Sequence, residues 1–380
     1  MSIKALHLFS NYKWTGPAEP AVNLAAGLKK LGLNVLFAPG HDAKGQSLIA
    51  GRCAGRDLKC VEDLRLGKHR RLLSDRRDAK RLAGIIDAAE VDVLHAHMDN
   101  DHRIALKALE TAGHRPVLVR TIYDGEPPVR LPGDADALIV ISKKVGRWLA
   151  GHHRRRCRRI YLVDAAIDTS RFAPRPRDKE TARRLGIAPG DIVAGIVARM
   201  QKHRRFDVLL EAFARAAIAE PRLKLLIIGR GTHADSVARR PVEELHISER
   251  VIFAGYRSDD YVSVANCMDF KIFLMPGTDG SCRAVRECMA LGKPVIAADR
   301  GVLAEIIDSG KNGLVVNDRV ENLRAAILRL AGDRRLRRRM ALAAAGKAAE
   351  HFNIERQAKE VQTIYQTLLS RTKKSRPEKR

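Results

Sequence analysis

The stretch at residues 275–297, MPGTDGSCRAVRECMALGKPVIA, decides the fold. An apolar run at residues 270–275 leads into it, and Pro276-Gly277 predicts a turn. A helical pattern then begins near Arg283 and ends at Gly292, where Lys293-Pro294 is a stop signal. The apolar residues 294–298 predict the next strand. The order strand, acidic loop, helix, strand is typical of a parallel α/β fold.

Two carboxylates lie eight positions apart in this stretch. Asp279 is expected in the loop, and Glu287 about a turn into the helix. Ligands of parallel sheets bind beyond the carboxyl ends of the strands, and the free amides at the start of the Arg283 helix favour an anion there. Both carboxylates could therefore reach one polyhydroxyl ligand. Two solvated carboxylates flanking a surface helix would show the same spacing.

The surrounding residues resemble the acidic-x7-Glu signature of the retaining glycosyltransferases of family 4. In that family a Glu-Gly-Phe-Gly loop precedes a second Glu and an Ala-Met-Ala-x-Gly-x-Pro-Val run. Here Asp279 stands for the first Glu, Glu287 stands for the second, and MALGKPV at residues 289–295 matches the run. Ser281-Cys282 replaces the Phe-Gly pair, and Asp279 is one methylene shorter than Glu. We therefore expect the loop amides to carry more of the sugar contact.

The resemblance implies an α/β fold of the GT-B type, with two doubly wound Rossmann-like domains facing a cleft. A length of 380 residues also favours two domains. We expect an acceptor-side domain at residues 1–167 and a linker at 168–190, which is rich in proline and charge. A nucleotide-sugar domain is expected at 191–350. Residues 351–380 are expected to form a helix returning to the first domain, with a basic tail.

The first domain supplies several candidate residues. The predicted strands are residues 5–9, 34–38, 91–97, 117–124, 137–142 and 160–163. His95 and His97 alternate to the same face of their strand, so a metal site would need a third ligand from Asp99 or His102. The resemblance instead places this strand end in the interdomain cleft.

The resemblance also assigns roles to residues of the first domain. Tyr123 stands where many relatives have His, so His97, Tyr123 and the adjacent Asp124 are candidate polar groups at the reaction centre. Gly16 matches the glycine that lies beside the donor phosphate, although an ordinary turn glycine would look the same. We expect no metal and no cofactor. The catalytic set is then Asp279, Glu287, His97 and Tyr123.

The second domain carries the expected donor site. Arg199 follows a predicted strand, and such cations suit a diphosphate. The resemblance pairs it with Arg204, and Lys202 and Arg205 remain alternatives. The other expected donor-binding residues lie at strand ends and in the acidic loop: Gly229, Gly231, Tyr256, Gly280, Ser281, Cys282 and Arg283.

Composition adds an expectation about partners. The formal net charge of +26 favours polyanions such as nucleic acid, an anionic membrane or phosphorylated substrates. Aromatic residues are only 4%, which disfavours a nucleic-acid binder built on stacking. The six cysteines show no metal spacing, no apolar run is long enough to span a bilayer, and no signal peptide opens the chain. We expect a cytoplasmic protein.

One basic run suggests a membrane contact. In KKVGRWLAGHHRRRCRR, residues 143–159, Val145, Trp148, Leu149 and Ala150 can form an apolar strip on a basic helix. Such a helix can lie in an anionic interface at the inner face of the cytoplasmic membrane. A surface helix with a short core-facing strip is the alternative.

The function implied by the resemblance is transfer of a hexose from a nucleotide diphosphate sugar, with retention at the anomeric carbon. The expected acceptor is a lipopolysaccharide, another cell-envelope glycolipid or a saccharide. Two alternatives remain: another GT-B enzyme such as a sugar-nucleotide epimerase or a phosphorylase, and a basic non-catalytic protein that binds polyanions. We expect no specific nucleic-acid partner.

Overall fold

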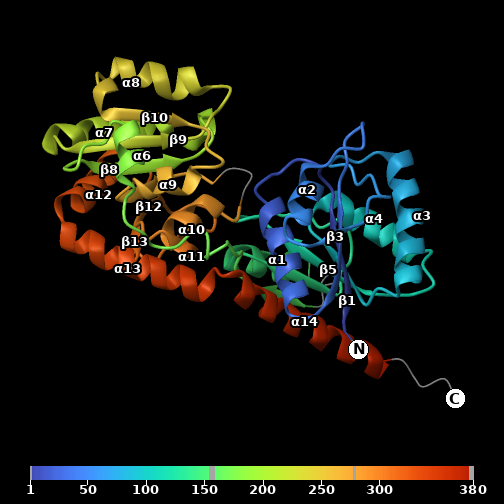
Figure 1. The fold of residues 1–380 in the computed structure, drawn as a ribbon. Helices are drawn as coiled ribbons and strands as arrows, with labels where there is room; N and C mark the ends of the chain where they lie inside the picture. Colours follow the sequence, from blue (N-terminus) through green and yellow to red (C-terminus); the bar gives the residue numbers. More distant parts are fainter. Residues whose placement is uncertain (1, 154–158, 277–279, 376–380) are drawn as a thin grey trace. The chain divides into compact units, whose positions relative to one another are not determined.

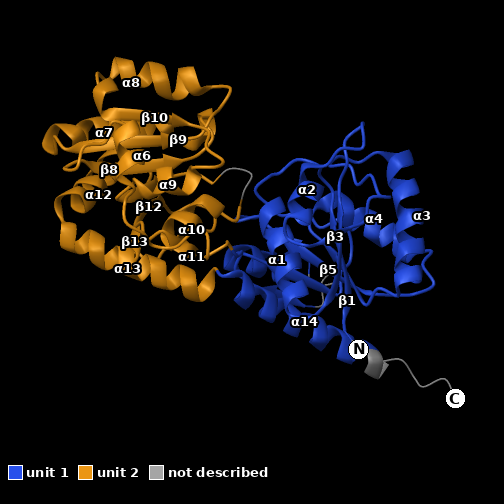
Figure 2. Ribbon diagram, in the orientation of Figure 1, with its two compact units in different colours: residues 1–166, 353–380 blue, residues 167–352 orange. Residues whose placement is uncertain are grey.

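In a computed structural model of the chain, residues 2–153, 159–276 and 280–375 are described. They form two compact units, shown in two colours in Figure 2. Unit 1 comprises residues 1–166 and 353–380, and unit 2 comprises residues 167–352. In each unit helices pack around one parallel sheet (Figure 1). This is the doubly wound α/β architecture that the sequence predicts.

Unit 1 contains a sheet of seven strands in the order β3-β2-β1-β4-β5-β6-β7. Every neighbouring pair is parallel. The strands are β1 (Lys4–Phe9), β2 (Asn34–Pro39), β3 (Lys59–Cys60), β4 (Val93–Ala96), β5 (Val117–Ile122), β6 (Ala137–Val140) and β7 (Ile160–Leu162). The helices are α1 (Ala18–Lys30), α2 (Leu48–Ala54), α3 (Leu72–Ala89), α4 (Asp99–Leu109), α5 (Lys143–His152) and α14 (Ile354–Ser375).

The last helix, α14, belongs to unit 1 although it follows unit 2 in sequence. Val361 and Tyr365 are fully buried in the same core cluster as the apolar face of α1. The two helices pack closely, since a Cβ at Gly27 would lie 2.9 Å from the Cβ of Ala358. The first and last parts of the chain therefore build one core.

Unit 2 contains a sheet of six parallel strands in the order β10-β9-β8-β11-β12-β13. The strands are β8 (Ile192–Val197), β9 (Leu223–Ile228), β10 (Val251–Gly255), β11 (Phe270–Phe273), β12 (Val295–Ala298) and β13 (Gly313–Val316). The helices are α6 (Lys179–Arg184), α7 (Phe206–Ala219), α8 (Arg240–Glu244), α9 (Tyr261–Asn266), α10 (Arg283–Ala290), α11 (Leu303–Ile306), α12 (Val320–Gly332) and α13 (Arg334–His351). The strand order reverses between β8 and β11, which makes this the switch point of the sheet.

Two expectations about these elements differ from the structure. Residues 168–190, expected as a linker, lie within unit 2, where Phe172, Ala182 and Ile187 are buried in the core. On α5, Val145 and Leu149 are fully buried in the core of unit 1. The expectation that this strip faces an interface is wrong for both residues, because the sheet needs their apolar surface. The basic residues 154–158 of that run lie outside the described residues.

Membrane spans were searched for among the described residues, and none of their helices is both long and apolar enough to cross a bilayer.

Candidate functional site

The switch point of unit 2 brings two predicted segments together. β8 and β11 pair directly, with Ala194 opposite Phe270. Arg199 follows the end of β8, and the loop before α10 follows the end of β11. Ligands of open α/β sheets bind in the crevice at such a reversal. The fold therefore places the expected donor-binding segments after the carboxyl ends of two neighbouring strands.

Glu287 is the best-defined side chain of this site. It lies on α10 and is only 2% exposed. The Tyr261 hydroxyl on α9 donates to its Oε2 at 2.8 Å, and the Arg283 Nε lies 3.6 Å from its Oε1. Burial raises the pKa of Tyr261 well above its ordinary value, so the phenol stays a donor. The carboxylate is thus fixed in orientation and keeps lone pairs for further hydroxyl donors.

The loop before α10 is held by buried groups. Ser281 and Cys282 are buried, and Nε of the fully buried Arg286 donates to the Ser281 carbonyl at 3.0 Å. Cys282 begins the helix with φ 49, in the left-handed region that favours glycine. The backbone shape that suits the family's glycine is therefore kept by a cysteine, at a cost of about 1 kcal/mol. Gly280 is buried next to them, and Asp279 lies outside the described residues.

The cations after β8 differ in how far they are already engaged. Arg205 is bound to Asp318 at 2.9 Å and to Asp207 at 3.3 Å, and its φ of 57 suits glycine better. Nη1 of Arg204 donates to the Met275 carbonyl at 2.7 Å, which ties the β8 loop to the β11 loop.

Two further cations stand close by. Arg199 and Lys202 are exposed, and neither forms an ion pair with another residue in the described part of the chain. Arg199 and Lys202 are thus the cations most open to an added anion, whereas Arg204 shapes the loop.

The predicted glycines and Tyr256 have structural roles that the sequence pattern did not indicate. A Cβ at Gly229 would lie 2.0 Å from the Ala198 carbonyl, and one at Gly231 would lie 2.1 Å from that of Met200. The turn after β9 needs glycine because it packs on the turn after β8. Tyr256 is 62% exposed, and the Arg230 guanidinium lies over its ring at 4.5 Å.

The predicted residues His97 and Tyr123 of unit 1 belong to a buried hydrogen-bonded chain. Nδ1 of His97 pairs with the Tyr123 hydroxyl at 3.0 Å, and its Nε2 pairs with Nδ1 of His7 at 2.9 Å. The Tyr365 hydroxyl of α14 lies 3.4 Å from Nε2 of His7 and 2.5 Å from Nδ1 of His95.

The hydrogen-bonded chain ends at a threonine hydroxyl. Nε2 of His95 pairs with Oγ1 of Thr121 at 2.7 Å. Each of the six ring nitrogens of His7, His95 and His97 therefore has a partner. Burial lowers the pKa of His7 to about 3 and holds the pKa values of His95 and His97 well below the ordinary value. All three rings are neutral, and each passes one N–H along the chain.

The expectation of a third metal ligand from Asp99 or His102 is wrong for both residues. Asp99 binds Arg120 at 3.1 Å, and Nε2 of His102 pairs with the Asp134 carbonyl at 3.1 Å. Among the described residues, His7 is the one that joins His95 and His97, with one ring nitrogen of each histidine within 4.8 Å of the others. The three histidines serve the hydrogen-bonded chain described above, so their nitrogens are not an open ligand set.

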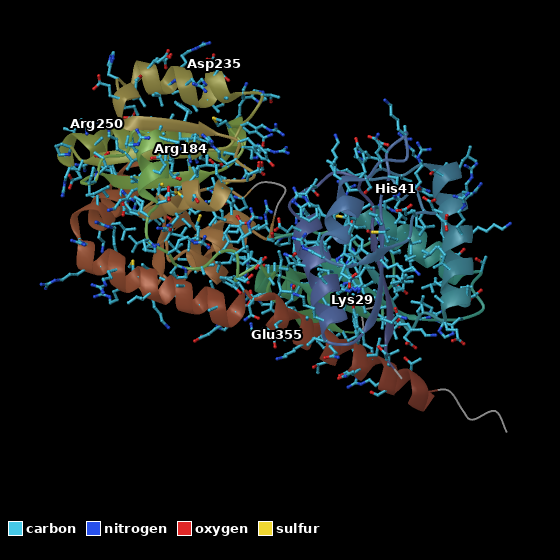
Figure 3. All side chains as sticks on the ribbon, viewed as in Figure 1. Lys29, His41, Arg184, Asp235, Arg250 and Glu355 are labelled. Atoms are coloured by element: carbon cyan, nitrogen blue, oxygen red, sulfur yellow. The ribbon has the colours of Figure 1, made fainter. Side chains whose placement is uncertain are left out.

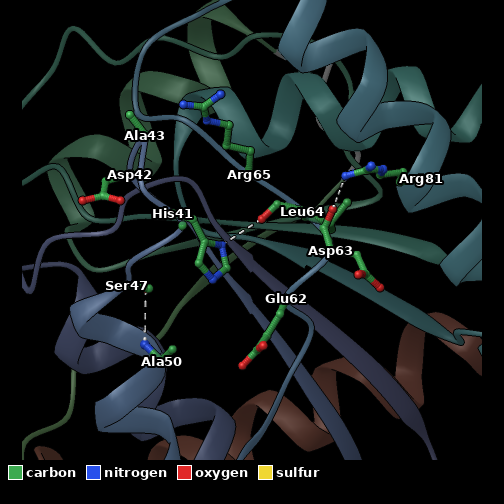
Figure 4. A pocket seen from close by; sticks show the side chains of 11 residues that line it. His41, Asp42, Ala43, Ser47, Ala50, Glu62, Asp63, Leu64, Arg65 and Arg81 are labelled. Atoms are coloured by element: carbon green, nitrogen blue, oxygen red, sulfur yellow. Dashed lines mark hydrogen bonds between the residues drawn. The ribbon is translucent and has the colours of Figure 1, made fainter.

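Gly16 and a pocket complete the polar features of unit 1. Gly16 lies in the turn before α1 (Ala18–Lys30), where the Ala18 amide donates to the Thr15 carbonyl at 3.0 Å. A pocket of about 440 Å³ lies beside α2 and the end of β3 (Figure 4). Its charged lining residues are His41, Asp42, Glu62, Asp63, Arg65 and Arg81.

Tyr261 and Tyr365 are among the residues of the sites that the sequence analysis missed. Tyr261, which fixes Glu287, lies five positions beyond Tyr256 and carries no motif of its own. Tyr365 reaches His95 across 270 positions of sequence. Neither contact has a local signal, although a tyrosine on the apolar face of a terminal helix is a common sign of a buried hydroxyl.

The two Rossmann-like units have the architecture called GT-B. Residues 177–347 match the model of the family described as Glycosyl transferases group 1, so this part of the chain is similar to that family. The predicted GT-B fold is confirmed by solved structures that cover nearly the whole chain. A glycosyltransferase from Rickettsia africae superposes with a TM-score of 0.81 at 17% identity, covering 97% of this chain and 99% of that one. Anabaena HepE in complex with UDP-glucose gives 0.78 at 19%, covering 96% and 100%.

Curated relatives are similar over part of the chain. The D-inositol 3-phosphate glycosyltransferase of Nocardia farcinica is 32% identical over 226 residues, which are 57% of this chain and 49% of the relative. The lipopolysaccharide core biosynthesis mannosyltransferase LpsB of Rhizobium meliloti is 26% identical over 216 residues, 53% of this chain and 59% of the relative. The chain thus spans about half the length of the curated relatives it matches.

Proposed function

We propose that the chain transfers a hexose from a nucleotide diphosphate sugar to a hydroxyl of a lipopolysaccharide or another cell-envelope glycolipid, with retention at the anomeric carbon. The observation that carries the proposal is Glu287, a buried carboxylate fixed by Tyr261 and Arg283 at the switch point of a group 1 domain. A carboxylate held in this way suits a pair of ribose hydroxyls. Its neighbours at the sheet edge suit a diphosphate.

The diphosphate is the leaving group, and its charge must be stabilised as it departs. Arg199 and Lys202 are exposed cations after the end of β8, and the first amides of α10 follow the loop after the neighbouring strand β11. Such fixed donors stabilise charge that develops in the transition state. The bond from the anomeric carbon to the phosphate oxygen breaks, and the acceptor oxygen bonds to that carbon. The proton of the acceptor hydroxyl leaves with the nucleoside diphosphate.

The other predicted residues keep the roles that the sequence resemblance implies. We propose that Asp279 and the amides of residues 280–283 hold the sugar, and that Gly16 lies beside the donor phosphate. His97 and Tyr123, predicted at the reaction centre, hold each other in place inside unit 1, since their polar atoms bind one another. The similarity to LpsB supports a cell-envelope saccharide as the acceptor.

The experiment measures donor binding and hydrolysis with Glu287→Gln, using UDP-glucose and GDP-mannose with and without lipopolysaccharide acceptors. Glutamine keeps the volume but loses the charged acceptor. Each lost hydrogen bond to a buried charged group costs about 1.5–3 kcal/mol, so donor affinity is expected to fall at least tenfold. Calorimetry gives the affinity, and chromatography of the released nucleotide gives the rate.

A matched control is Glu244→Gln, which changes an exposed carboxylate on α8 of the same unit. It should leave both quantities unchanged. A folded Glu287→Gln protein with wild-type donor affinity and rate would contradict the assignment. Donor hydrolysis without transfer to any glycolipid would retain the donor site and reject the acceptor class.

A further inference from the structure

The beginning of α3 and the loop before it form a cationic surface in unit 1. All of the lysine and arginine side chains between residues 68 and 81 are exposed: Lys68, Arg70, Arg71, Arg76, Arg77, Lys80 and Arg81. None of them forms an ion pair with a residue that the structure describes. Blue nitrogen tips project from α3 on the side away from the sheet of unit 1 (Figure 3). This charge is available to a partner.

The acidic residues of the same stretch do not neutralise it. Asp75 is 5% exposed and accepts from the Arg71 amide at 3.0 Å. Asp78 is 2% exposed and accepts from the amides of Arg65 and Leu66 at 3.1 and 3.0 Å. Both carboxylates face inward and serve the backbone. The outer face of α3 therefore has one sign of charge until Asp87.

Two large apolar side chains stand among these cations. Leu72 is 55% exposed and Leu73 is 79% exposed. Leu73, Arg76, Arg77 and Lys80 follow helical spacing, so they share one face of α3. We call residues 68–73 together with Arg76, Arg77 and Lys80 the α3 face. Exposed leucines inside a cationic surface are costly in water unless a partner covers them.

We propose that the α3 face docks unit 1 onto an anionic lipid bilayer. Anionic headgroups complement the cations, and each cation close to such a surface strengthens binding by roughly fivefold. Leu72 and Leu73 would enter the headgroup boundary, as apolar residues of interfacial segments do. A nucleic acid would meet the cations but would leave the leucines in water. The bilayer is therefore the partner that uses both features.

A bilayer docked at the α3 face would carry the lipid-linked acceptor, and this link to the acceptor rests on the proposed function. Arg81, at the end of the same cationic stretch, also lines the 440 Å³ pocket, where its Nη1 donates to the Asp63 carbonyl at 2.9 Å. The α3 face replaces the apolar strip of α5 as the membrane contact, because Val145 and Leu149 of that strip are buried.

Unit 2 offers a matched control surface on α13. Arg335, Arg338 and Arg339 are exposed there at helical spacing with Leu342, which is 71% exposed. This surface has a single leucine and fewer cations, so it controls for the chain's overall positive charge. We would make two double variants of the α3 face: one carries Leu72→Ser and Leu73→Ser, and the other carries Arg76→Gln and Arg77→Gln. The controls are Leu342→Ser, and Arg338→Gln with Arg339→Gln.

Co-sedimentation uses vesicles of phosphatidylcholine alone and vesicles that also contain phosphatidylglycerol. Wild-type protein should bind only the anionic vesicles, and added salt should weaken that binding. The arginine double variant should lose about 25-fold in partition coefficient and the leucine double variant about tenfold. The α13 variants should change it by less than threefold. Circular dichroism checks that every variant is folded.

Three outcomes would overturn the proposal: equal binding to both vesicle types, equal losses in the α13 and α3 variants, or loss only in the arginine variant with full competition by single-stranded RNA. The last outcome would identify a nucleic acid as the partner. Hydrolysis of the donor in solution, measured on the same samples, should be unchanged in the α3 variants. Wild-type protein that hydrolyses the donor but binds neither vesicle type rejects docking alone. Wild-type protein that binds anionic vesicles but does not hydrolyse the donor rejects the proposed function alone.

Discussion

The two units share a parallel sheet with helices on both faces, but they differ in what occupies the centre of the sheet. In unit 1 the neighbouring strands β1 and β4 place His7 opposite His95, and α14 adds the hydroxyl of Tyr365. In unit 2 the paired centre of β8 and β11 is apolar except for Lys271. A fold of this kind therefore tolerates polar groups in its core when each of them has a partner.

The difference also indicates where each unit uses its polar side chains. The hydrogen-bonded chain that begins at the Thr121 hydroxyl and ends at the Tyr123 hydroxyl links β1, β4, β5 and α14. It therefore holds the last helix to the sheet of unit 1. In unit 2 the polar groups gather at the carboxyl ends of the strands, where Glu287 and Arg199 lie. Unit 1 uses its buried polar groups for structure, whereas under the proposed function unit 2 keeps Glu287 for a ligand.

The largest expected effect is selective acid unfolding of unit 1. The pKa of His7 is lowered to about 3, and those of His95 and His97 lie well below 6.5, so below pH 6.5 the unfolded chain binds protons that the folded unit rejects. Stability is therefore lost as the pH falls from 6.5 toward 3, by up to about 4 kcal/mol per pH unit for the three rings. Burial raises the pKa of Asp101 to about 7 and also raises that of Asp124, and these two carboxyl groups oppose the loss.

Tryptophan fluorescence can measure this transition in unit 1 alone. The chain has two tryptophans, Trp14 and Trp148, and both lie in unit 1. Hydrogen exchange with mass spectrometry follows unit 2, where His203, His233 and His246 are exposed. Unit 1 should open at the higher pH. Opening of unit 2 first, or of both units at one pH, would contradict the role given to the buried histidines.

How much the sequence could predict depends on the range of the interactions involved. The strand-helix-strand pattern around residues 275–297 is local, and the fold and the position of Glu287 followed from it. The distant partners of His97 and His95 were not predictable, because His7 is 90 positions from His97 and Tyr365 is 270 positions from His95 along the chain. The strip on α5 was misassigned because a half-buried helix has the same periodicity whether its apolar face meets a sheet or a membrane.

A smaller effect is expected from Tyr365→Phe. The ring is kept, but Nδ1 of His95 and Nε2 of His7 lose the hydroxyl between them. Leaving buried polar atoms without a partner costs about 1–3 kcal/mol, so the urea midpoint of the fluorescence transition should fall. Tyr161→Phe is the control, since Tyr161 on β7 is half-buried and its hydroxyl has no partner among the described residues. Equal midpoints for the two variants would show that the chain does not stabilise unit 1.

The smallest effect tests Lys271, a buried polar residue in the sheet of unit 2. Lys271 is fully buried on β11, its Nζ has no hydrogen-bond partner in the described structure, and burial lowers its pKa. The charge of the Glu287 carboxylate opposes that shift, so the lysine lies close enough to act on the proposed donor site. Lys271→Met removes a desolvated amine and should raise the stability of unit 2 by about 1 kcal/mol at neutral pH. The gain should shrink as the pH rises toward 10.5, because the folded wild-type unit binds this proton more weakly than the unfolded chain does.

Lys293→Met is the matched contrast, because Nζ of Lys293 donates to the Asn266 carbonyl at 2.9 Å. Its loss leaves that carbonyl unpaired and should lower stability by about 1 kcal/mol. Hydrogen exchange of unit 2 gives both changes, and calorimetry with UDP-glucose gives donor affinity. If unit 2 keeps its polar core group for function, Lys271→Met gains stability and loses donor affinity, since the carboxylate of Glu287 loses a nearby positive charge. If Lys271→Met instead loses stability and binds the donor normally, Lys271 has a structural role, as the buried histidines of unit 1 do. The two units would then not differ in how they use their buried polar groups.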